Sequence, residues 1–466
     1  MSGNYETETS LGQTMFGHAE LHDERRTARL VATFDALRRH PGGTLPDKLS
    51  SPADLKALYR LCACAAVTHT ALIAAMRSYT FARIATHDGV VLVVHDATEL
   101  DYTTLFSLTE CLGQIGKGTH RGYICHNVLA VDAQTGEVLG LLDQILHCRD
   151  EVPDGETLPE LRARETRESL LWIKGTQHLP RDARLVDVAD QGASTFEFLE
   201  HQTHSGRRFV IRNGKVRKVY AGHDASGPKH YLKDYAQSLP ELGRFTMDVQ
   251  PQKGRKARTA AEFTLRGGAI LLLPPHAKHG HHGRDPLPLY VVYVAEVKPP
   301  RGEKPIEWML VTNEPVRSYE DAWRVVSWYE RRWIIEEYHK ALKTGCQIEE
   351  LQFTYAQRLQ PAIALLSAVA LTLLDLRDAS RRPDAHTRRA TTLVAREYVE
   401  VLSGWRHGKI RRDLTIHEFF FALARLGGHQ NRRHDHRPGW LVLWRGWTKL
   451  QCMLDGYLAA QRTKCG

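Results

Sequence analysis

Four side chains that could act at a phosphate group occur within residues 329–343, in the segment SWYERRWIIEEYHKALKTG. They are Tyr329, Arg332, Glu336 and Lys343. On an α-helix, at about 100° per residue, these side chains fall within a wedge of roughly 60°. One carboxylate between two cations and a phenol suits a metal ion bound next to a phosphate. A solvated helix face with i,i+4 ion pairs would show the same pattern.

A second stripe on this helix predicts how it is buried. Trp328, Ile335 and Leu342 recur at seven-residue spacing and form an apolar face beside the polar one. A carboxylate on such a helix needs partners, which we expect where buried strands end. The run VVLVVHDATEL closes on Asp96, and the apolar run RLVDVADQGAS closes on Asp190, followed by a glycine that allows a sharp turn.

The order of the remaining elements indicates a fold class. YICHNVLAVDAQTGEVLGLLDQIL holds two alternating runs around Thr135-Gly136, which predicts a hairpin. ELRARETRESLLWIKG predicts a charged helix, and RRFVIRN predicts a strand after a short helix. The order is strand, hairpin pair, helix, strand, helix, strand, and later the Glu336 helix. This order is typical of a ribonuclease-H-like α/β fold with a mixed sheet.

With this set of residues the chain resembles the bacterial cut-and-paste DDE transposases of the insertion-sequence-four family, and within it the transposon-five type. The resemblance rests on the Asp-Asp-Glu set, on the Tyr-Arg-Glu-Lys signature, and on segments such as DERRTARLV, GYICHNVLA and FALARLGG. It covers nearly the whole chain. One departure is visible, because the family usually follows its second Asp with Arg-Glu-Ala-Asp. This chain has Gln191-Gly192-Ala193-Ser194, which keeps the metal ligand and changes the accessory polar residues.

The resemblance implies that Asp96, Asp190 and Glu336 are the catalytic and metal-binding residues. Two Mg²⁺ ions per active site, for which Mn²⁺ can substitute, would lie about 4 Å apart and clamp the attacking and leaving oxygens. Asp96 would bridge the ions, with Asp190 and Glu336 each holding one. The implied reaction cuts one strand with water and forms a hairpin by attack of the freed 3′-hydroxyl. The hairpin is then opened, and the new 3′-hydroxyl is joined to target DNA.

The resemblance also implies contacts with DNA. Tyr329, Arg332 and Lys343 would hold the phosphate that bends back in the hairpin. Arg212, at the end of RRFVIRN, matches a DNA-contacting arginine. Trp308 matches a tryptophan that stacks on a flipped-out base, with packing in a strand as the alternative. The DNA-binding candidates are Tyr329, Arg332, Lys343, Lys340, Arg212, Trp308, Arg25, Arg26 and Arg29.

Two other carboxylates compete with the proposed metal ligands. Asp101 sits too far past the expected end of the first strand. Asp187 precedes Asp190 by three residues within one strand, so its side chain should point to the opposite face of the sheet.

The pattern divides the chain into three regions. Residues 1–70 are expected to form a helical DNA-end-binding domain, and residues 71–375 the catalytic domain. About a hundred residues separate Arg212 from the Glu336 helix, which is too many for a simple connection. We therefore expect a β-rich insertion at about 213–315. Residues 376–466 are expected to form a helical C-terminal domain.

Each outer region has an amphipathic signature. In the N-terminal helix, Arg25, Arg26 and Arg29 lie on one side, and Leu30, Phe34 and Leu37 on another. Ser51-Pro52 predicts a capped helix through Leu61. Near the C-terminus, an apolar stripe predicts either domain core or a dimer interface, the latter implied by the resembling family. Its members are Trp440, Trp444, Trp447, Leu450, Leu454 and Tyr457.

Histidine-rich and basic loops raise further possibilities. The insertion carries KGRKAR (Lys253 to Arg258) at an expected hairpin tip, and four histidines in PPHAKHGHHGRD. These histidines (His276, His279, His281 and His282) invite a zinc site. However, the loop lacks cysteines and a firm scaffold, which favours a polar loop. His434-Asp435-His436 has the same interpretation.

Composition agrees with a nucleic-acid partner without proving one. The net charge is +9 and the pI is about 9.1, which also suits an ordinary basic enzyme. The longest apolar run, in QPAIALLSAVALTLLDL, predicts a core helix rather than a membrane span. The N-terminal residues carry no export signal, so a cytoplasmic location is expected. The eight cysteines are scattered and are expected to be reduced thiols.

The sequence therefore predicts a DNA transposase that acts as a homodimer on transposon ends and target DNA, without a membrane. Two alternatives remain open. One is a domesticated DNA-binding protein that no longer cuts DNA, and the other is a nuclease of the same fold that resolves branched DNA.

Overall fold

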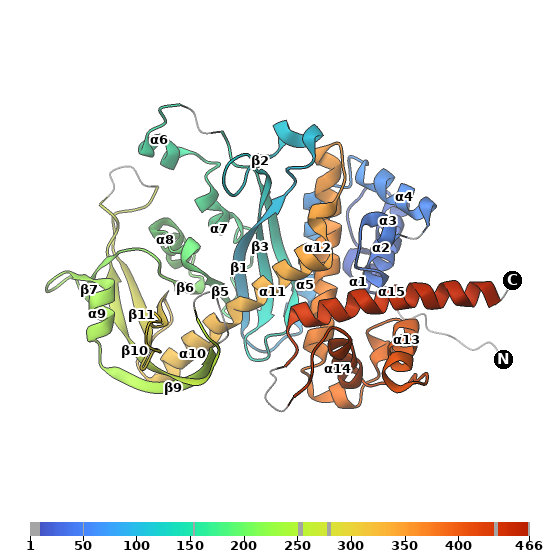
Figure 1. The fold of residues 1–466 in the computed structure, drawn as a ribbon. Helices are drawn as coiled ribbons and strands as arrows, with labels where there is room; N and C mark the ends of the chain where they lie inside the picture. The colour runs from blue at the N-terminus through green and yellow to red at the C-terminus, as the bar shows by residue number, and fades with distance from the viewer. Residues whose placement is uncertain are drawn as a thin grey trace.

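A large mixed sheet lies between helical N-terminal and C-terminal regions in a mixed α/β chain (Figure 1). The computed structural model describes residues 10–49, 51–151, 154–249, 255–276, 281–432 and 437–464. The sheet consists of twelve strands within these ranges. The strands are β1 (Val91–Asp101), β2 (Gly113–Gln114), β3 (Arg121–Asp132), β4 (Val138–His147), β5 (Leu185–Ala189), β6 (Arg208–Arg212), β7 (Lys218–Ala221), β8 (His230–Tyr231), β9 (Glu241–Val249), β10 (Arg258–Leu272), β11 (Leu287–Glu296) and β12 (Glu307–Thr312).

The order of the strands places β1 and β5 side by side in the sheet. The path runs β2-β3-β1-β5-β6-β12-β11-β10-β7-β8, with β4 paired to β3 and β9 paired to β10. Only the β1–β5 and β5–β6 pairs are parallel, and the other pairs are antiparallel. The short apolar run of β5 is buried at every residue, as expected for a strand covered on both faces.

The first strand is longer than the sequence indicates. We expected it to close on Asp96, but β1 continues to Asp101, because β3 pairs with it from Asp132 back to Gly122. Its parallel pairing with β5 stops at His95 opposite Ala189. Asp96 is therefore the first residue beyond the parallel pair, although it lies in the middle of the strand.

The predicted hairpin around Thr135-Gly136 is confirmed as the β3–β4 connection. Gly136 has φ of +75°, a left-handed conformation that glycine adopts without strain.

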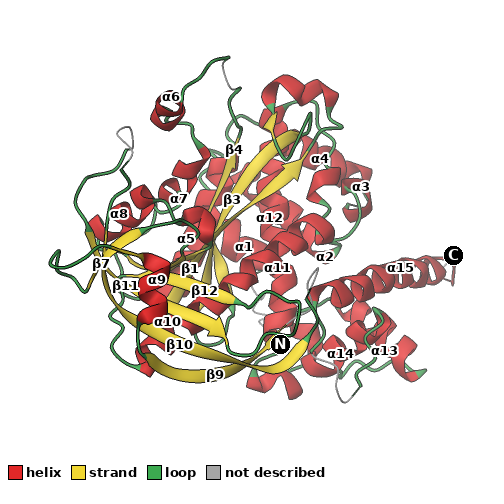
Figure 2. Cartoon of the chain, turned by 60° about the vertical axis from the view of Figure 1, so that its left-hand side comes forward, coloured by secondary structure: helices red, strands yellow, loops and turns green. Residues whose placement is uncertain are grey.

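The region at about 213–315 is β-rich, as predicted, but it does not form a separate sheet. The longer strands of this region are β9, β10, β11 and β12. They continue the central sheet, because β12 pairs with β6 through Leu310 opposite Arg212 (Figure 2). The short strands β7 and β8 and one short helix complete this region.

Helices cover the sheet and form the two outer regions. The α-helices are α1 (Leu11–Phe16), α2 (Glu24–Arg39), α3 (Leu45–Lys48), α4 (Pro52–Cys62), α5 (His69–Ala85), α6 (Leu158–Ala163), α7 (Leu171–Lys174), α8 (Phe196–His204), α9 (Leu232–Ser238), α10 (Tyr319–Glu330), α11 (Ile334–Lys340), α12 (Ala356–Ala379), α13 (Arg396–His407), α14 (Ile416–Leu426) and α15 (Trp440–Lys464). Shorter helical turns are η1 (Phe106–Cys111), η2 (Glu168–Leu170), η3 (Gln191–Ala193), η4 (Arg331–Trp333), η5 (Ala341–Gly345), η6 (Ile348–Glu350), η7 (Pro383–His386) and η8 (Ala390–Thr392).

The N-terminal helices follow their sequence signals. The Ser51 side chain accepts a hydrogen bond from the Asp54 N–H and caps α4, which starts at Pro52 as predicted. In α2, Leu30, Phe34 and Leu37 are buried, as their spacing predicts. Helices α2 and α4 pack against α12.

The predicted single helix over residues 160–175 is wrong. The chain forms the short helices α6 and α7, separated by extended backbone at Arg164 and Arg167. The Arg167 guanidinium donates to the carbonyl oxygens of Arg162 and Arg164, and it pairs with Glu197. These bonds satisfy carbonyl groups at the end of α6, which would accept backbone N–H groups if the helix continued.

The apolar run predicted as a core helix forms α12, and most of its side chains are buried. It is the one described helix that is long and apolar enough to cross a membrane by length and composition. Some 72% of its most apolar window is buried inside the protein, which agrees with a core helix.

The C-terminal stripe is part of the protein core. Trp440, Trp444, Trp447, Leu450 and Leu454 are all buried in one cluster that also includes residues of α12, α13 and α14. Tyr457 is partly buried against the same cluster. Of the two interpretations of this stripe, domain core accounts for these residues within a single chain.

The seven cysteines that the structure describes are free thiols, as predicted. Several loops singled out in the sequence fall partly outside the described residues, namely Lys253 and Gly254 of the basic run, His279, and His434-Asp435-His436. Arg258 opens β10 and pairs with Glu296 and Glu303.

Candidate active site

Asp96 and Asp190 are the first residues beyond the parallel pairing of two neighbouring strands. His95 is opposite Ala189 in the β1–β5 register, so the next residue on each strand is one of these aspartates. The Asp190 carboxylate accepts a hydrogen bond of 2.8 Å from the Gly192 N–H and caps the turn η3. The predicted turn after Asp190 is therefore present, and it orients the carboxylate.

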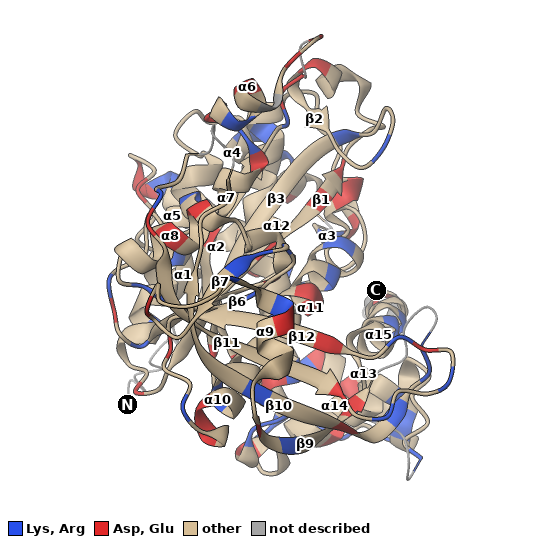
Figure 3. Cartoon of the chain, turned by 90° about the vertical axis from the view of Figure 1, so that its left-hand side faces the viewer, with Lys and Arg blue, Asp and Glu red and all other residues tan. Residues whose placement is uncertain are grey.

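Glu336 lies on a helical segment that is less regular than the sequence indicates. The segment passes from α10 through the 3-10 turn η4 into α11, and then into the π-helical turn η5. The predicted uniform 100° per residue is wrong here, because η4 is wound more tightly and η5 more loosely than an α-helix. Trp328, Ile335 and Leu342 are buried, as predicted. Acidic positions occur on both β1 and α11 (Figure 3).

Arg332 connects the first strand to the late helix. Its Nη1 lies 3.1 Å from Asp96 Oδ2, and its Nη2 lies 2.8 Å from Glu336 Oε1. The pair with Asp96 joins residues that are far apart in sequence, whereas the pair with Glu336 is an i,i+4 contact within the segment. The Arg332 side chain is 13% exposed. Burial alone would lower the pKa of Arg332, but Tyr329 and the two carboxylates outweigh it and raise the pKa.

Asp96 is held in an environment that disfavours its charge. Burial raises the pKa of Asp96 to about 6, although Arg332 opposes this increase. The Asp190 and Glu336 carboxylates add to the increase by repulsion, which places each of them within electrostatic reach of Asp96. A cation bound at this point would relieve that repulsion.

The carboxylates of Asp96, Asp190 and Glu336 do not converge into a metal-binding group in the structure. No group of three or more His, Cys, Asp or Glu residues that could hold a metal ion occurs among the residues that the structure describes. This result applies also to the histidine-rich loop, as far as it is described. At the strand ends, the Arg332 guanidinium pairs with both Asp96 and Glu336.

The two lysines of the segment differ in their surroundings. Lys343 lies in the π-helical turn, and its Nζ is 3.0 Å from Glu349 Oε1. The loop that carries Glu349 contacts β1, because the Asp101 N–H donates to Glu349 Oε1 at 2.9 Å. Lys340 is exposed, with its Nζ 5.3 Å from the centre of the Trp333 ring.

Trp308 and Arg212 lie on neighbouring strands beside this segment. The Trp308 ring on β12 meets the Tyr329 ring edge to face, with their centres 5.4 Å apart. Tyr329 is buried and Trp308 is partly buried. Arg212 ends β6 and donates through Nη2 to the Glu307 carbonyl at 3.3 Å. Trp308 therefore adjoins the predicted phosphate-binding residues, and it also packs against the core.

The competing carboxylates have other partners. Asp187 is fully buried, accepts from Arg207 Nε at 2.7 Å, and lies 2.8 Å from His95 Nε2. It points to the opposite face from Asp190, as the strand spacing predicts. Asp101 lies 3.0 Å from His120 Nδ1 and accepts a hydrogen bond from Thr103.

A network of buried polar side chains lies under α11 and was not predicted from the sequence. Asn127 is opposite Asp96 in the β1–β3 register, and its Nδ2 donates to His339 Nε2 at 3.1 Å. Burial lowers the pKa of His339 to about 3, so the neutral ring can accept this bond. The Gln144 side chain donates to Asn127 Oδ1 at 2.8 Å. These bonds hold the Glu336 helix against the strands, and the polar Asn127 within the apolar run GYICHNVLA is their signal in the sequence.

Comparison with known families identifies the N-terminal region. Residues 10–67 match the family model described as transposase DNA-binding. The match supports a transposase, with DNA as its partner. It covers helices α1 to α4, and the aspartates and Glu336 lie outside it.

Within the matched region, the three arginines of α2 already have partners in the protein. Arg25 is highly exposed and pairs with Asp23 at 3.1 Å. Arg29 lies 3.5 Å from Asp54, and Arg26 donates to the Leu21 carbonyl at 2.9 Å. These bonds orient the cations but leave Arg25 open to solvent.

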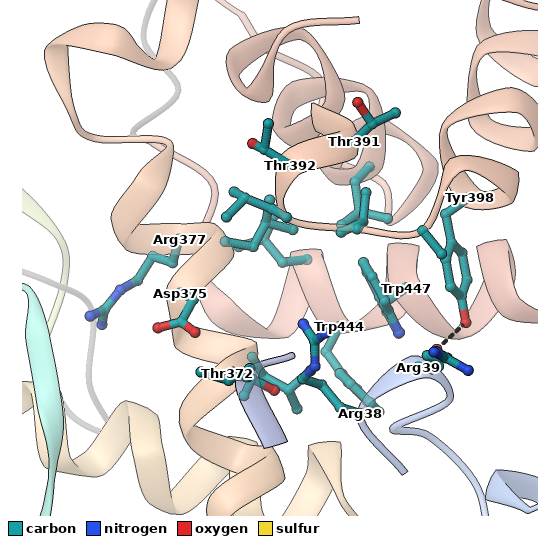
Figure 4. A pocket seen from close by; sticks show the side chains of 18 of the residues that line it. Arg38, Arg39, Thr372, Asp375, Arg377, Thr391, Thr392, Tyr398, Trp444 and Trp447 are labelled. Atoms are coloured by element: carbon teal, nitrogen blue, oxygen red, sulfur yellow. Dashed lines mark hydrogen bonds between the residues drawn. The ribbon is translucent and has the colours of Figure 1, made fainter. Parts of the chain in front are cut away.

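A cavity lies between the N-terminal and C-terminal helices. A space of about 520 Å³ lies between the ends of α1 and α2, the last turns of α12 and the C-terminal helices. Asp375, Arg38 and Trp447 line it (Figure 4). Burial raises the pKa of Asp375 to about 7, although the nearby Arg83 opposes this increase. None of the predicted catalytic or DNA-binding residues lines this cavity.

Proposed function

We propose that this protein is a cut-and-paste DNA transposase whose catalytic centre is built from Asp96, Asp190 and Glu336 in a ribonuclease-H-like core. The observation that carries the proposal is the link that Arg332 makes between Asp96 and Glu336, next to Asp190. We infer that these three carboxylates, from different elements, would converge once Arg332 releases Asp96 and Glu336. The transposase DNA-binding match at residues 10–67 supplies the DNA partner.

The donor chemistry of this centre suits Mg²⁺. The three proposed ligands offer only carboxylate oxygens, which this hard cation prefers. The raised pKa of Asp96 reflects negative charges that a cation would stabilise. Bound Mg²⁺ would supply the Lewis acid that phosphodiester cleavage and strand transfer use. Arg332 has to release Asp96 and Glu336 before they can act as ligands, since it now neutralises both.

The other residues of the segment would then act on the DNA. Once released, the Arg332 guanidinium would pair with a phosphate, for which its planar fork is suited. Lys343 would add a second cation, and Tyr329 would pack beside Arg332, whose Cζ lies 6.0 Å from the ring centre. Trp308 would stack on a base displaced by the hairpin bend after turning away from Tyr329. Arg212 and Lys340 would contact the DNA backbone.

We further propose three regions, a homodimer and a cytoplasmic location. The regions are the end-binding residues 1–70, the catalytic residues 71–375 and the helical residues 376–466. In the dimer, each active site would process one transposon end. The last turns of α15, beyond the buried stripe, extend away from the rest of the chain (Figure 1) and would pair two subunits. If short and long DNA ends are mixed, the complex should contain one of each, and single-end complexes alone would contradict the dimer.

The function can be tested with the DNA that flanks the gene. Labelled fragments carrying its inverted ends are incubated with the protein and Mg²⁺ or Mn²⁺, and products are separated on a denaturing gel. We expect nicks, then hairpins, then joined products, with EDTA preventing all three. A protein that binds these ends but never cuts them would contradict the proposal.

One observation favours a second candidate, a DNA-binding protein that no longer cuts. Asp96 and Glu336 are both occupied by Arg332, and no ready-made metal-ligand group occurs in the described part of the chain. Calorimetric titration with Mg²⁺ and bound DNA separates the candidates, because only a transposase should bind the ion at these carboxylates.

A further inference from the structure

A groove about 480 Å³ in volume lies between the N-terminal helices and the loop that precedes α12. It is lined by residues of three segments that are far apart in the chain. They are Tyr59 on α4, Thr104 to Ser107 at the start of η1, and Gln352 to Thr354 with Arg358 at the start of α12. Helix α4 packs beside α12, and this contact brings the segments together (Figure 2).

Aromatic side chains stand exposed in and beside this groove. Phe106 is 84% exposed, Tyr355 is 54% exposed and Tyr59 is 37% exposed. The Tyr59 ring meets the buried Phe353 ring edge to face at 5.5 Å, which fixes its position. A large apolar ring exposed to this degree marks a surface that binds a partner when several such rings gather at one place.

Cations surround the aromatic groove. A neighbouring groove of about 390 Å³ shares Tyr59 and Arg358 with the first and adds Lys56 and Arg60. The Arg358 guanidinium lies 4.6 Å from the centre of the Tyr355 ring. No ion pair engages Lys56, Arg60 or Arg358 within the part of the chain that the structure describes. Their charges therefore remain available for an anionic partner.

We propose that this aromatic groove binds unpaired nucleotides of the DNA end that the protein processes. Rings exposed among free cations suit single-stranded DNA, because bases stack on aromatic rings while phosphates pair with cations. A fully paired duplex hides the faces of its bases and would leave the rings unused. Lys56, Tyr59 and Arg60 lie within the residues that match transposase DNA-binding, which favours DNA over a protein partner.

The position of the groove relates it to the proposed active site. The part of β1 from Asp96 to Asp101 spans about 17 Å, and the first groove residue, Thr104, follows three residues after Asp101. Lys343 lies along this path through its pairing with Glu349, which is bonded to the Asp101 N–H. At about 3.4 Å per base pair, the stretch of β1 from Asp96 to Asp101 has the length of about five base pairs. DNA opened near the cleavage point can reach the groove.

The inference rests on the proposed function for its substrate, and it can fail separately. Binding is measured by fluorescence anisotropy with two 30-base-pair duplexes of the same sequence. One is fully paired, and the other has four extra unpaired thymidines at one end. We expect the wild-type protein to bind the frayed duplex about tenfold more tightly, from stacking of one or two bases.

Matched variants test whether the groove causes this preference. Phe106→Ala and Tyr355→Ala should bind both duplexes equally, with paired-duplex binding unchanged. Leu441→Ala is the control, because Leu441 is a similarly exposed apolar side chain (53%) on α15, outside the groove. Photocrosslinking with 5-iododeoxyuridine in the unpaired end should label peptides that contain Phe106 or Tyr355.

The outcomes separate the two proposals. If the wild-type protein binds both duplexes equally, or if Phe106→Ala keeps the preference, the groove is not a site for unpaired nucleotides and the inference is overturned. Crosslinks only to other peptides would also overturn it. The same holds if the protein self-associates and Phe106→Ala abolishes that self-association, because the groove would then bind a second copy of the protein. If neither duplex binds at all, the proposed function fails as well.

Discussion

Asp187 and Asp190 are three residues apart in the chain and lie in opposite chemical settings. Asp187 lies inside the protein, between His95 and Arg207, with both partners within 2.8 Å. Burial would raise its pKa, but these partners outweigh burial and hold the pKa of Asp187 low. Asp190 accepts a hydrogen bond from the Gly192 N–H, and it follows Ala189, which is paired with the residue before Asp96.

The difference concerns the balance of charge around a carboxylate. The buried Asp187 already has a cation and hydrogen-bond donors within the protein. It therefore stabilises the fold, and its carboxylate is not available to a further cation. At the strand ends, one guanidinium serves Asp96 and Glu336, with Asp190 nearby. A cluster of this kind has spare negative charge and can accept a further cation.

The largest effect should come from the strand-end carboxylates. Asp190→Asn keeps the shape of the side chain and removes its charge. Cleavage of DNA ends in Mg²⁺ should slow by about a thousandfold or more, because several kcal/mol of charge stabilisation is lost. Binding of DNA ends should remain, and thermal unfolding should change little. Single-turnover cleavage on labelled ends measures the rate, and near-normal cutting would refute this role.

Asp187→Asn should give the converse result. Arg207 would lose its buried carboxylate partner, and the variant should be destabilised by about 3–5 kcal/mol. Urea unfolding monitored by circular dichroism measures this loss. Molecules that remain folded should still cleave DNA at the wild-type rate. A stable variant with no cleavage would mean that the assignments of Asp187 and Asp190 have to be exchanged.

A smaller effect is expected at the residues proposed to hold the bent DNA. Trp308→Ala removes the stacking surface, and Arg332→Ala removes the phosphate partner and the neutralisation of Asp96 and Glu336. Each should nick the first strand nearly normally and form hairpins about tenfold more slowly, in line with about 1–3 kcal/mol for a stacked base. A time course on a denaturing gel separates nicked from hairpin DNA. Normal hairpin rates in both variants would refute these roles.

The smallest effect concerns Asp375, which tests whether a raised pKa marks the active site. Asp375 has a pKa of about 7, higher than that of Asp96, and lines a cavity whose lining includes none of the proposed ligands. The folded state keeps this proton up to about pH 7, whereas the unfolded chain releases it near pH 4. Its contribution to stability is therefore present at pH 4 and is lost as the pH rises to about 7.

Asp375→Asn should consequently stabilise the protein at pH 8 by about 1 kcal/mol, after allowance for water in the cavity, and should change little at pH 4. Thermal melts across this range test the sign, and cleavage should be unaffected. If the variant is less stable at pH 8 or loses cleavage, the Asp375 carboxylate has a role that burial and its raised pKa do not explain.

Several parts of the site could be predicted from local patterns. The β-branched run before Asp96 and the apolar run before Asp190 predict two buried strands, and both strands are present. Period-two alternation also predicted that Asp187 and Asp190 face opposite sides. Other parts could not be predicted, because they depend on contacts between distant residues. The full length of β1, the break at Arg164 and the pairing of Lys343 with Glu349 are of this kind.

The sequence by itself determined which residues are capable of the chemistry, because residue type and spacing are local properties. It determined the carboxylates, the cations of the late helix and the apolar faces that bury each element. Only the tertiary structure decided which of these side chains meet. The parallel register of β1 with β5 places Asp96 beside Asp190, and the packing of α11 on β3 brings Arg332 to Asp96. Register and packing depend on the summed burial of many residues across the sheet, which no single segment encodes.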